Sequence, residues 1–201
     1  MVYPRGSAAG SIFHLKITLL GIEPAIWRLM AVRGDTALPR LHRILQAAMG
    51  WEDYHLHLFR VGREHFGVPD PDFDDNTVDE RGKRLRDLAS YGDAFIYEYD
   101  FGDGWRHLVE VDGVLDQNEN ELLPRCIEGE RTCPPEDVGG IGGYKEFLRV
   151  IRDPSEEEHE RMLEWAGGRF DPEGFDLEEA EARMRRLRPR RAPKRDAAKA
   201  P

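Results

Sequence analysis

The sequence predicts an α+β protein, built on a mixed or antiparallel sheet. Three observations lead to this fold class. Segments in which apolar and polar residues alternate, as in half-buried strands, are concentrated in the first part of the chain. Helical spacing dominates the last third, and strands and helices in separate blocks are typical of α+β folds. The 201 residues are 40% hydrophobic, which is enough for one sizeable core.

The chain opens with a predicted strand–strand–helix unit. Residues 13–19 alternate strictly, and the second strand covers residues 25–32 after a break at Gly21 to Pro24. The inward side chains of the first strand are expected to be Phe13, Leu15, Ile17 and Leu19. The helix that follows has apolar residues at 38, 41, 45 and 48, with Asp35 or Thr36 as its N-cap and Gly50 at its end.

A central β-hairpin is expected over residues 93–111. Aromatic and β-favouring residues flank Asp103-Gly104, a pair that suits a two-residue type I′ turn because both positions need positive φ. Such a turn places Asp100 opposite His107 on one face of the hairpin. A carboxylate beside an imidazole orients the ring for metal binding or proton transfer, or simply stabilises the hairpin.

The last third of the chain is predicted to be helical. One helix covers residues 144–151, and a second starts near Ser155, whose spacing to Glu158 fits a capping box. A third helix runs to about Leu187, and Asp176 with Glu179 makes a similar capping-box start for it. We expect these C-terminal helices to pack on the sheet.

Charge is distributed unevenly along the chain. The net charge is −10, and residues 185–201 carry eight basic side chains against one acidic one, so the remaining residues carry −17. A body of that charge repels the phosphates of nucleic acid, which leaves the basic tail as the only segment expected to bind DNA or RNA. The composition of the tail is also typical of a disordered, solubilising end.

The predicted organisation is a single domain with two extensions. We expect a flexible N-terminus over residues 1–11, one α+β domain over 12–188 and a basic disordered tail over 189–201. No apolar segment approaches the ~20 residues that a membrane span needs, so no membrane partner is expected. Residues 1–11 lack the apolar core of a secretory signal, which predicts a cytoplasmic protein.

Histidines and acidic residues make up the candidate site. His55 and His57 lie two residues apart on a predicted strand, so both rings should point to the same face. Together with Asp100 they could hold Zn²⁺ or Mn²⁺ and leave a coordination position open. Trp105, as an apolar wall, and His107 complete the predicted pocket.

Two alternatives stay open for these residues. If the site is catalytic, His107 or Glu98 is the expected general base. If it is not, His55 and His57 are solvent-facing residues of a half-buried strand.

Neither the cysteines nor the glycine-rich segment gives a strong functional signal. Six residues separate Cys126 from Cys133, whereas structural zinc sites usually have two or four residues between paired cysteines. They are expected to be ordinary buried or semi-exposed thiols, with a Cys2His2 zinc site as the alternative. Residues 133–144 lack the Lys-Ser/Thr ending of a phosphate-binding loop, and Glu136 and Asp137 are expected to tie this segment to the hairpin.

Several segments, taken in order, resemble one protein family. They are residues 15–19 (LKITL), 24–28 (PAIWR), 50–59 (GWEDYHLHLF), 97–107 (YEYDFGDGWRH), 133–137 (CPPED) and 170–173 (FDPE). In this combination the chain is similar to the plasmid pRiA4b ORF-3-like proteins over roughly residues 13–187. The resemblance implies a compact α+β domain that originates among plasmid-borne and insertion-sequence passenger proteins, some labelled TnpR-like. Family members often have a cysteine where this chain has Val138, so the resemblance does not support a three-thiolate metal site here.

These observations lead to three expectations of function. The first is a plasmid- or transposon-associated accessory or binding domain with a polar pocket lined by histidine and aspartate. The second is a metal-dependent hydrolase, such as a nuclease, in which His55, His57 and Asp100 hold the metal. The third is a protein-interaction module without catalysis.

Overall fold

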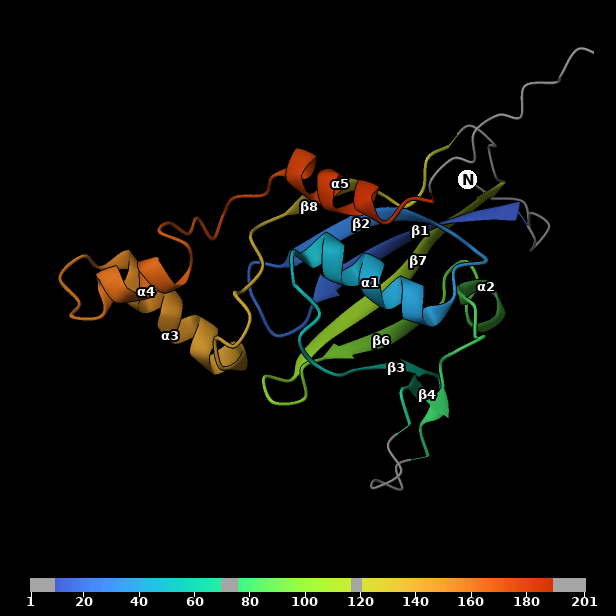
Figure 1. Ribbon diagram of the computed structural model, residues 1–201, viewed down its shortest axis with the longest axis horizontal. Coiled ribbons are helices and arrows are strands. Elements are labelled where there is room, and N and C mark those ends of the chain that lie inside the picture. The colour runs from blue at the N-terminus through green and yellow to red at the C-terminus, as the bar shows by residue number, and fades with distance from the viewer. Residues whose placement is uncertain (1–9, 70–75, 117–120, 190–201) are drawn as a thin grey trace, which may run out of the picture.

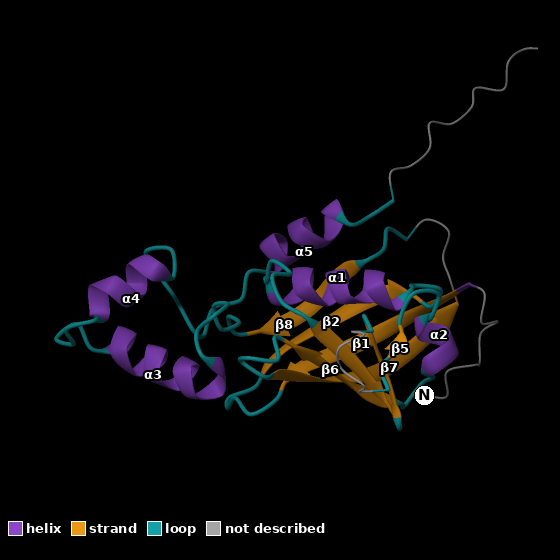
Figure 2. Cartoon of the chain, turned by 60° about the horizontal axis from the view of Figure 1, so that its bottom comes forward, coloured by secondary structure: helices purple, strands orange, loops and turns teal. Residues whose placement is uncertain are grey.

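The core of the protein is one eight-stranded sheet. A computed structural model describes residues 10–69, 76–116 and 121–189. Its elements are β1 (Ser11–Leu19), β2 (Ile26–Arg33), α1 (Leu38–Met49), β3 (His57–Val61), β4 (Glu64–Gly67), β5 (Val78–Asp79), α2 (Leu85–Leu88), β6 (Ala94–Tyr99), β7 (Trp105–Asp116), β8 (Arg125–Glu130), α3 (Gly140–Arg152), α4 (His159–Trp165) and α5 (Leu177–Arg186). The strand order is β5-β4-β3-β6-β7-β1-β2-β8 (Figures 1 and 2). All neighbours are antiparallel except β4 and β5, and the predicted α+β class is confirmed.

The main core lies between the sheet and helix α1. The four inward residues predicted for β1 are each at most 3% exposed, while the residues between them are partly accessible. Leu38, Leu41 and Leu45 of α1 pack into the same cluster from the other side. Burial of this face therefore fixes the register of the strands, because a one-residue slip would turn the apolar side chains outward.

The C-terminal helices divide between two positions. Helix α5 packs against α1 and β8, over the same face of the sheet as α1 (Figures 1 and 2). Helices α3 and α4 pack on each other and form a hairpin beyond one end of the sheet (Figure 1). Tyr144 and Phe147 of α3 connect this hairpin to the main core.

Two of the three predicted helix caps are wrong. Helix α1 has Ala37 as its N-cap, and Asp35 binds Arg33 instead. Backbone hydrogen bonds with residues 83–85 hold the start of α1, so no side-chain cap is needed there. Helix α4 starts after Glu158, because the Ser155 hydroxyl donates to Asp153 instead of capping the helix.

The third cap and the end of the first helix are as the sequence predicted. The Asp176 carboxylate accepts a hydrogen bond from the Glu179 amide at 2.9 Å and caps α5. Gly50 ends α1 with a φ of 95°, a conformation that favours glycine.

The central hairpin exists, but its predicted register is wrong. β6 and β7 pair Tyr99 with Trp105 and Tyr97 with His107, which leaves a five-residue loop over 100–104. Asp100 therefore does not face His107. The loop forms because Asp100 adopts a φ of 55° and its Oδ1 accepts a hydrogen bond from the Gly102 amide at 2.9 Å. The observed register puts the aromatic residues of both strands on the face under α1.

Most of the two predicted extensions lies outside the described residues. The flexible N-terminus was expected over 1–11, but β1 already begins at Ser11, and the description starts at residue 10. The predicted tail over 189–201 has only its first residue among those described. Within the described ranges, none of the helices combines the length and the apolar character needed to cross a membrane.

Candidate functional site

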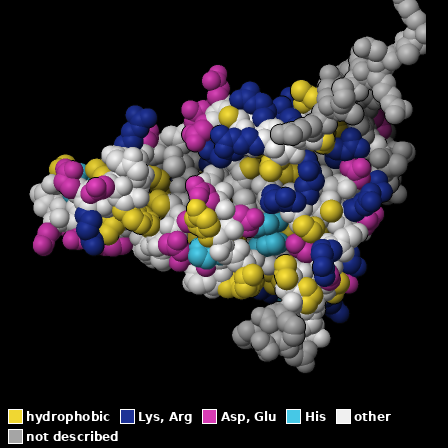
Figure 3. Space-filling view, viewed as in Figure 1, with side chains coloured by type: hydrophobic (Ala, Val, Ile, Leu, Met, Phe, Trp, Pro, Cys, Tyr) yellow, Lys and Arg dark blue, Asp and Glu magenta, His cyan; other side chains and the backbone are white. Residues whose placement is uncertain are grey.

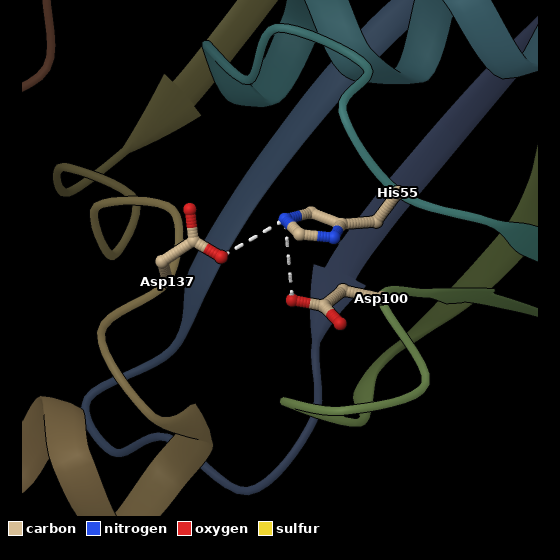
Figure 4. A group of neighbouring side chains, drawn as sticks. All are labelled: His55, Asp100 and Asp137. Atoms are coloured by element: carbon tan, nitrogen blue, oxygen red, sulfur yellow. Dashed lines mark ion pairs between the residues drawn. The ribbon is translucent and has the colours of Figure 1, made fainter.

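His55, Asp100 and Asp137 come together at one end of the sheet (Figure 4). Their ligand atoms all lie within 4.8 Å of one another. His55 Nε2 is 3.0 Å from Asp137 Oδ1 and 3.7 Å from Asp100 Oδ2. The three residues come from three different connections, α1–β3, β6–β7 and β8–α3. We call this group the His–Asp–Asp triad.

The β6–β7 loop orients Asp100. Its Oδ1 accepts hydrogen bonds from the amides of Gly102 and Asp103, at 2.9 and 3.3 Å, which keeps Oδ2 directed toward His55. The side chain is only 11% exposed. Asp100 is thus a largely buried carboxylate with one oxygen used by its own loop and the other available to the triad.

Contacts between the β6–β7 loop and the β8–α3 connection hold Asp137 in place. Glu136 accepts hydrogen bonds from the Tyr99 hydroxyl and from the Glu52 amide, so the prediction that Glu136 ties this segment to the hairpin is confirmed. Asp103 Oδ2 accepts a hydrogen bond from the Gly139 amide at 3.1 Å. Asp137, which was expected to make a structural tie, instead faces His55.

The close approach of these two loops depends on glycine at position 140. A Cβ atom there would lie 2.5 Å from the Asp103 carbonyl oxygen, and the residue has a φ of 66°. Both observations exclude a larger side chain without movement of the backbone. Gly140 thus allows the first residues of α3 to contact the β6–β7 loop, and this contact helps to bring the triad together.

His55 contributes a nitrogen atom that no hydrogen bond satisfies. Its Nε2 is buried and lacks a partner of suitable geometry, although two carboxylates lie near it. The ring also packs with its edge against Tyr99, at 5.8 Å between ring centroids. One imidazole nitrogen and two carboxylate oxygens form a donor set that suits Zn²⁺ or Mn²⁺. Within the described ranges, no other three histidine, cysteine or acidic side chains bring ligand atoms this close.

His57 is not a member of the triad. The predicted strand alternation fails because β3 begins at His57 and His55 lies in a bend before it. His57 Nε2 lies 3.0 Å from Glu80 Oε2, and its ring stacks on His42 with 3.6 Å between centroids. The three ligands predicted from sequence thus reduce to His55 and Asp100, and Asp137 is the third residue near them.

A buried polar network surrounds His57 and was missed in the sequence. His42 Nδ1 lies 2.8 Å from the Tyr97 hydroxyl, and His42 Nε2 lies 2.5 Å from Asp53 Oδ1. Burial and the neighbouring His57 lower the pKa of His42 to about 4. Glu80 is 3% exposed. No pattern in the residues around Glu80 predicted that its carboxylate would lie beside His57.

Trp105 and His107 lie in the core, so they do not line an open pocket. Trp105 is 1% exposed, and His107 is fully buried against Trp51, with its Nδ1 3.2 Å from the Tyr97 carbonyl oxygen. Burial lowers the pKa of His107 to about 3, which keeps its ring neutral at physiological pH. A general base must reach substrate, and His107 has no exposed surface from which to do so.

Glu98, the other predicted general base, is directed away from the triad. Neighbouring β6 residues alternate between faces, and Tyr97 and Tyr99 occupy the face under α1. Glu98 is on the other face, where its carboxylate pairs with Arg60 at 2.7 Å. This salt bridge links β6 to β3 and gives Glu98 a structural role.

A groove of about 750 Å³ begins beside the triad. It lies between the α3–α4 hairpin and the α1–α5 layer, and Asp137 and Tyr54 are part of its lining. Trp165 and Arg169 line the groove on the side of the α3–α4 hairpin. Histidine, acidic and apolar side chains lie together in the middle of the face seen in Figure 3. Asp137 is the triad residue that lines this groove, whose volume is in the range of small-molecule sites.

Comparisons with known proteins agree with the fold. The family model described as "Plasmid pRiA4b ORF-3-like protein" matches residues 11–179. The chain belongs to this family. The uncharacterized protein y4hQ of Sinorhizobium fredii (strain NBRC 101917 / NGR234) is 42% identical over 161 residues, which cover 78% of this chain and 81% of that protein. A crystal structure of a protein of unknown function, MM3350 from Methanosarcina mazei Go1, is similar with a TM-score of 0.77 at 37% identity, over 85% of this chain and 97% of the other.

The two cysteines of this pRiA4b ORF-3-like protein are free and buried, as the simpler of the two expectations predicted. Arg28 Nη2 donates to Cys133 Sγ at 3.2 Å, and burial raises the pKa of this thiol. Burial raises the pKa of Cys126 to about 11. Neither thiol is part of the triad, so a Cys2His2 site has no support among the described residues.

Proposed function

We propose that this pRiA4b ORF-3-like protein is a binding domain whose functional centre is one Zn²⁺ or Mn²⁺ ion. The ligands are His55 Nε2 and one carboxylate oxygen each from Asp100 and Asp137. The observation that carries the proposal is the buried His55 Nε2, which has two carboxylates within 3.7 Å and no hydrogen bond. A lone pair on this nitrogen can bind a metal ion directly.

Charge also favours a cation at this point. Asp100 and Asp137 bring two negative charges together, and Asp100 is largely buried. Like charges at this distance repel each other. A divalent ion neutralises both carboxylates, and three protein ligands leave further coordination positions open toward the groove.

The experiment measures metal uptake by the protein without an affinity tag. We expect isothermal titration with MnCl₂ or ZnCl₂ to give one site per chain, and His55→Ala and Asp137→Asn to abolish it. His65→Ala and Asp112→Asn are the matched controls, because both residues lie outside the triad. Equal uptake by the His55→Ala variant and the wild type would refute the proposal.

A metal-dependent hydrolase is the second candidate function. The open coordination positions favour it, since a metal-bound water is the nucleophile in many hydrolases. Neither His107 nor Glu98 can assist such a water, because one is in the core and the other is on the opposite face. Turnover of bis(p-nitrophenyl) phosphate that needs Mn²⁺ and is lost in Asp137→Asn would support this candidate. A rate equal in the variant would exclude it.

A further inference from the structure

We infer that the groove beside the triad takes a nucleoside monophosphate, with its phosphate on the metal ion and its base against Trp165. This inference rests on the proposed metal site and adds the class of ligand. Three properties of the groove support it: its volume, the presence or absence of partners for its charged side chains, and the exposed ring of Trp165.

The size of the groove selects a small molecule. Its volume of about 750 Å³ is within the range of roughly 300–1,000 Å³ typical of small-molecule sites. A long nucleic acid is disfavoured, since residues 1–184 carry a net charge of −17. A single phosphate can still bind to a protein of this negative charge if a divalent ion and a nearby arginine contact it.

Of the three arginines that line the groove, Arg169 is the one without a partner among the described residues. Arg28 donates to four backbone carbonyls and to Cys133, and Arg183 binds Glu179 and the Ala47 carbonyl. Arg169 is exposed and makes no hydrogen bond or ion pair with any described residue. A guanidinium without a partner in a wall that also contains Asp137 suits a phosphate bound to the triad metal.

Most acidic side chains that line the groove already have hydrogen-bond or ion-pair partners within the protein. Glu136 binds Tyr99 and the Glu52 amide, Asp176 caps α5, and Glu179 pairs with Arg183. A metal ion at the triad neutralises Asp137. Arg169 then stands out as the groove cation without a partner among the described residues, and this favours an anionic group at that point of the groove.

Trp165 supplies a surface for an aromatic base close to the triad. Its side chain is 50% exposed, although its ring packs edge-on against Phe147 at 6.0 Å between centroids. Trp165 and Asp137 together line both this groove and a second cavity of about 330 Å³ against α3. Apolar side chains gather on the side of the α3–α4 hairpin that faces the body of the molecule (Figure 3). Bases stack on exposed aromatic rings of this kind in single-stranded nucleic acid complexes.

The experiment uses the full chain loaded with Mn²⁺ and compares AMP, adenosine and inorganic phosphate as probes. We expect AMP to quench tryptophan fluorescence and to bind at least tenfold more tightly than either part alone. Removal of the metal, or the Arg169→Gln substitution, should weaken the binding of AMP at least tenfold. The Trp165→Leu substitution should remove the quenching of tryptophan fluorescence by AMP. Arg161→Gln is the matched control, because Arg161 is on α4 but pairs with Glu158 and is not part of the groove lining.

Three results would overturn the inference. These are equal affinity for AMP and inorganic phosphate, tighter binding of a single-stranded oligonucleotide than of AMP, and AMP affinity unchanged in Arg169→Gln. Metal content is measured on the same samples, which separates the two proposals. A chain that takes up Mn²⁺ but not AMP refutes the ligand alone, whereas a chain that takes up no metal refutes the site as well.

Discussion

Replacement of His107 by leucine should make the protein less sensitive to acid. The ring is fully buried, and its pKa falls to about 3, from the 6.5 of an exposed histidine, because burial disfavours the charged form. Below pH 6.5 the unfolded chain therefore binds a proton at this position while the folded chain does not. The stability that the neutral ring contributes is complete above pH 6.5 and is lost as the pH falls toward 3.

The magnitude follows from the two pKa values. Between pH 7 and pH 5 this one group should lower the free energy of unfolding by about 2 kcal/mol, since each pH unit below the unfolded-state pKa of 6.5 costs about 1.4 kcal/mol. His42 adds a similar loss, because its pKa is lowered to about 4. Leucine is uncharged at all pH values, and the difference between wild type and variant isolates the contribution of His107.

The assay is urea unfolding, followed by tryptophan fluorescence at pH 7 and at pH 5. The wild type should lose about 2 kcal/mol more than His107→Leu over this interval. His107→Gln is measured in parallel in case leucine does not fit the site, and His65→Leu is the control with a partly exposed ring. An identical loss in the wild type and both His107 variants would refute the assignment of His107 as a neutral core residue.

Three further predictions concern the core, the thiols and the tail. Tyr97→Phe should lower the free energy of unfolding by about 1–3 kcal/mol in urea titrations, since the buried hydroxyl accepts a hydrogen bond from Gln46 at 2.8 Å, and no loss would contradict the network. Cys126 and Cys133 should resist a thiol reagent until the protein unfolds, because both are buried with raised pKa values, and rapid labelling of the native chain would contradict this. Deletion of residues 190–201 should leave the melting temperature unchanged but abolish any salt-sensitive binding of duplex DNA in a gel-shift assay; a lower melting temperature or retained binding would argue otherwise.

The strands under α1 could be predicted from sequence because their signal is local. Phe13 to Leu19 alternates strictly, and the burial of its odd-numbered residues follows from that pattern alone. The same kind of pattern could have corrected the hairpin. Tyr97 and Tyr99 on one strand, and Trp105 and His107 on the other, can share one buried face only if the loop has an odd number of residues, which excludes the two-residue turn. The turn preference of Asp103-Gly104 was the weaker signal, because a slip in register would have exposed two tyrosines.

The triad could be predicted only in part because it is assembled from distant loops. His55 and Asp100 were recognised by residue type, although the reasons given for bringing them together, strand alternation and the hairpin register, were both wrong. Asp137 joins them because Gly139 contacts Asp103 and Glu136 contacts Tyr99, and both contacts span long stretches of sequence. No local periodicity encodes such contacts. The run of acidic residues after two prolines was the only available signal, and it indicated a structural tie.

The most direct test of the proposed centre is a crystal of the protein soaked in MnCl₂, with data collected at a wavelength where manganese scatters anomalously. We predict one strong anomalous peak within about 2–2.5 Å of His55 Nε2 and of a carboxylate oxygen from each of Asp100 and Asp137. The peak should be absent from crystals of Asp137→Asn. A peak between His57 and Glu80 instead, or no peak near His55 in the wild type, would contradict the account.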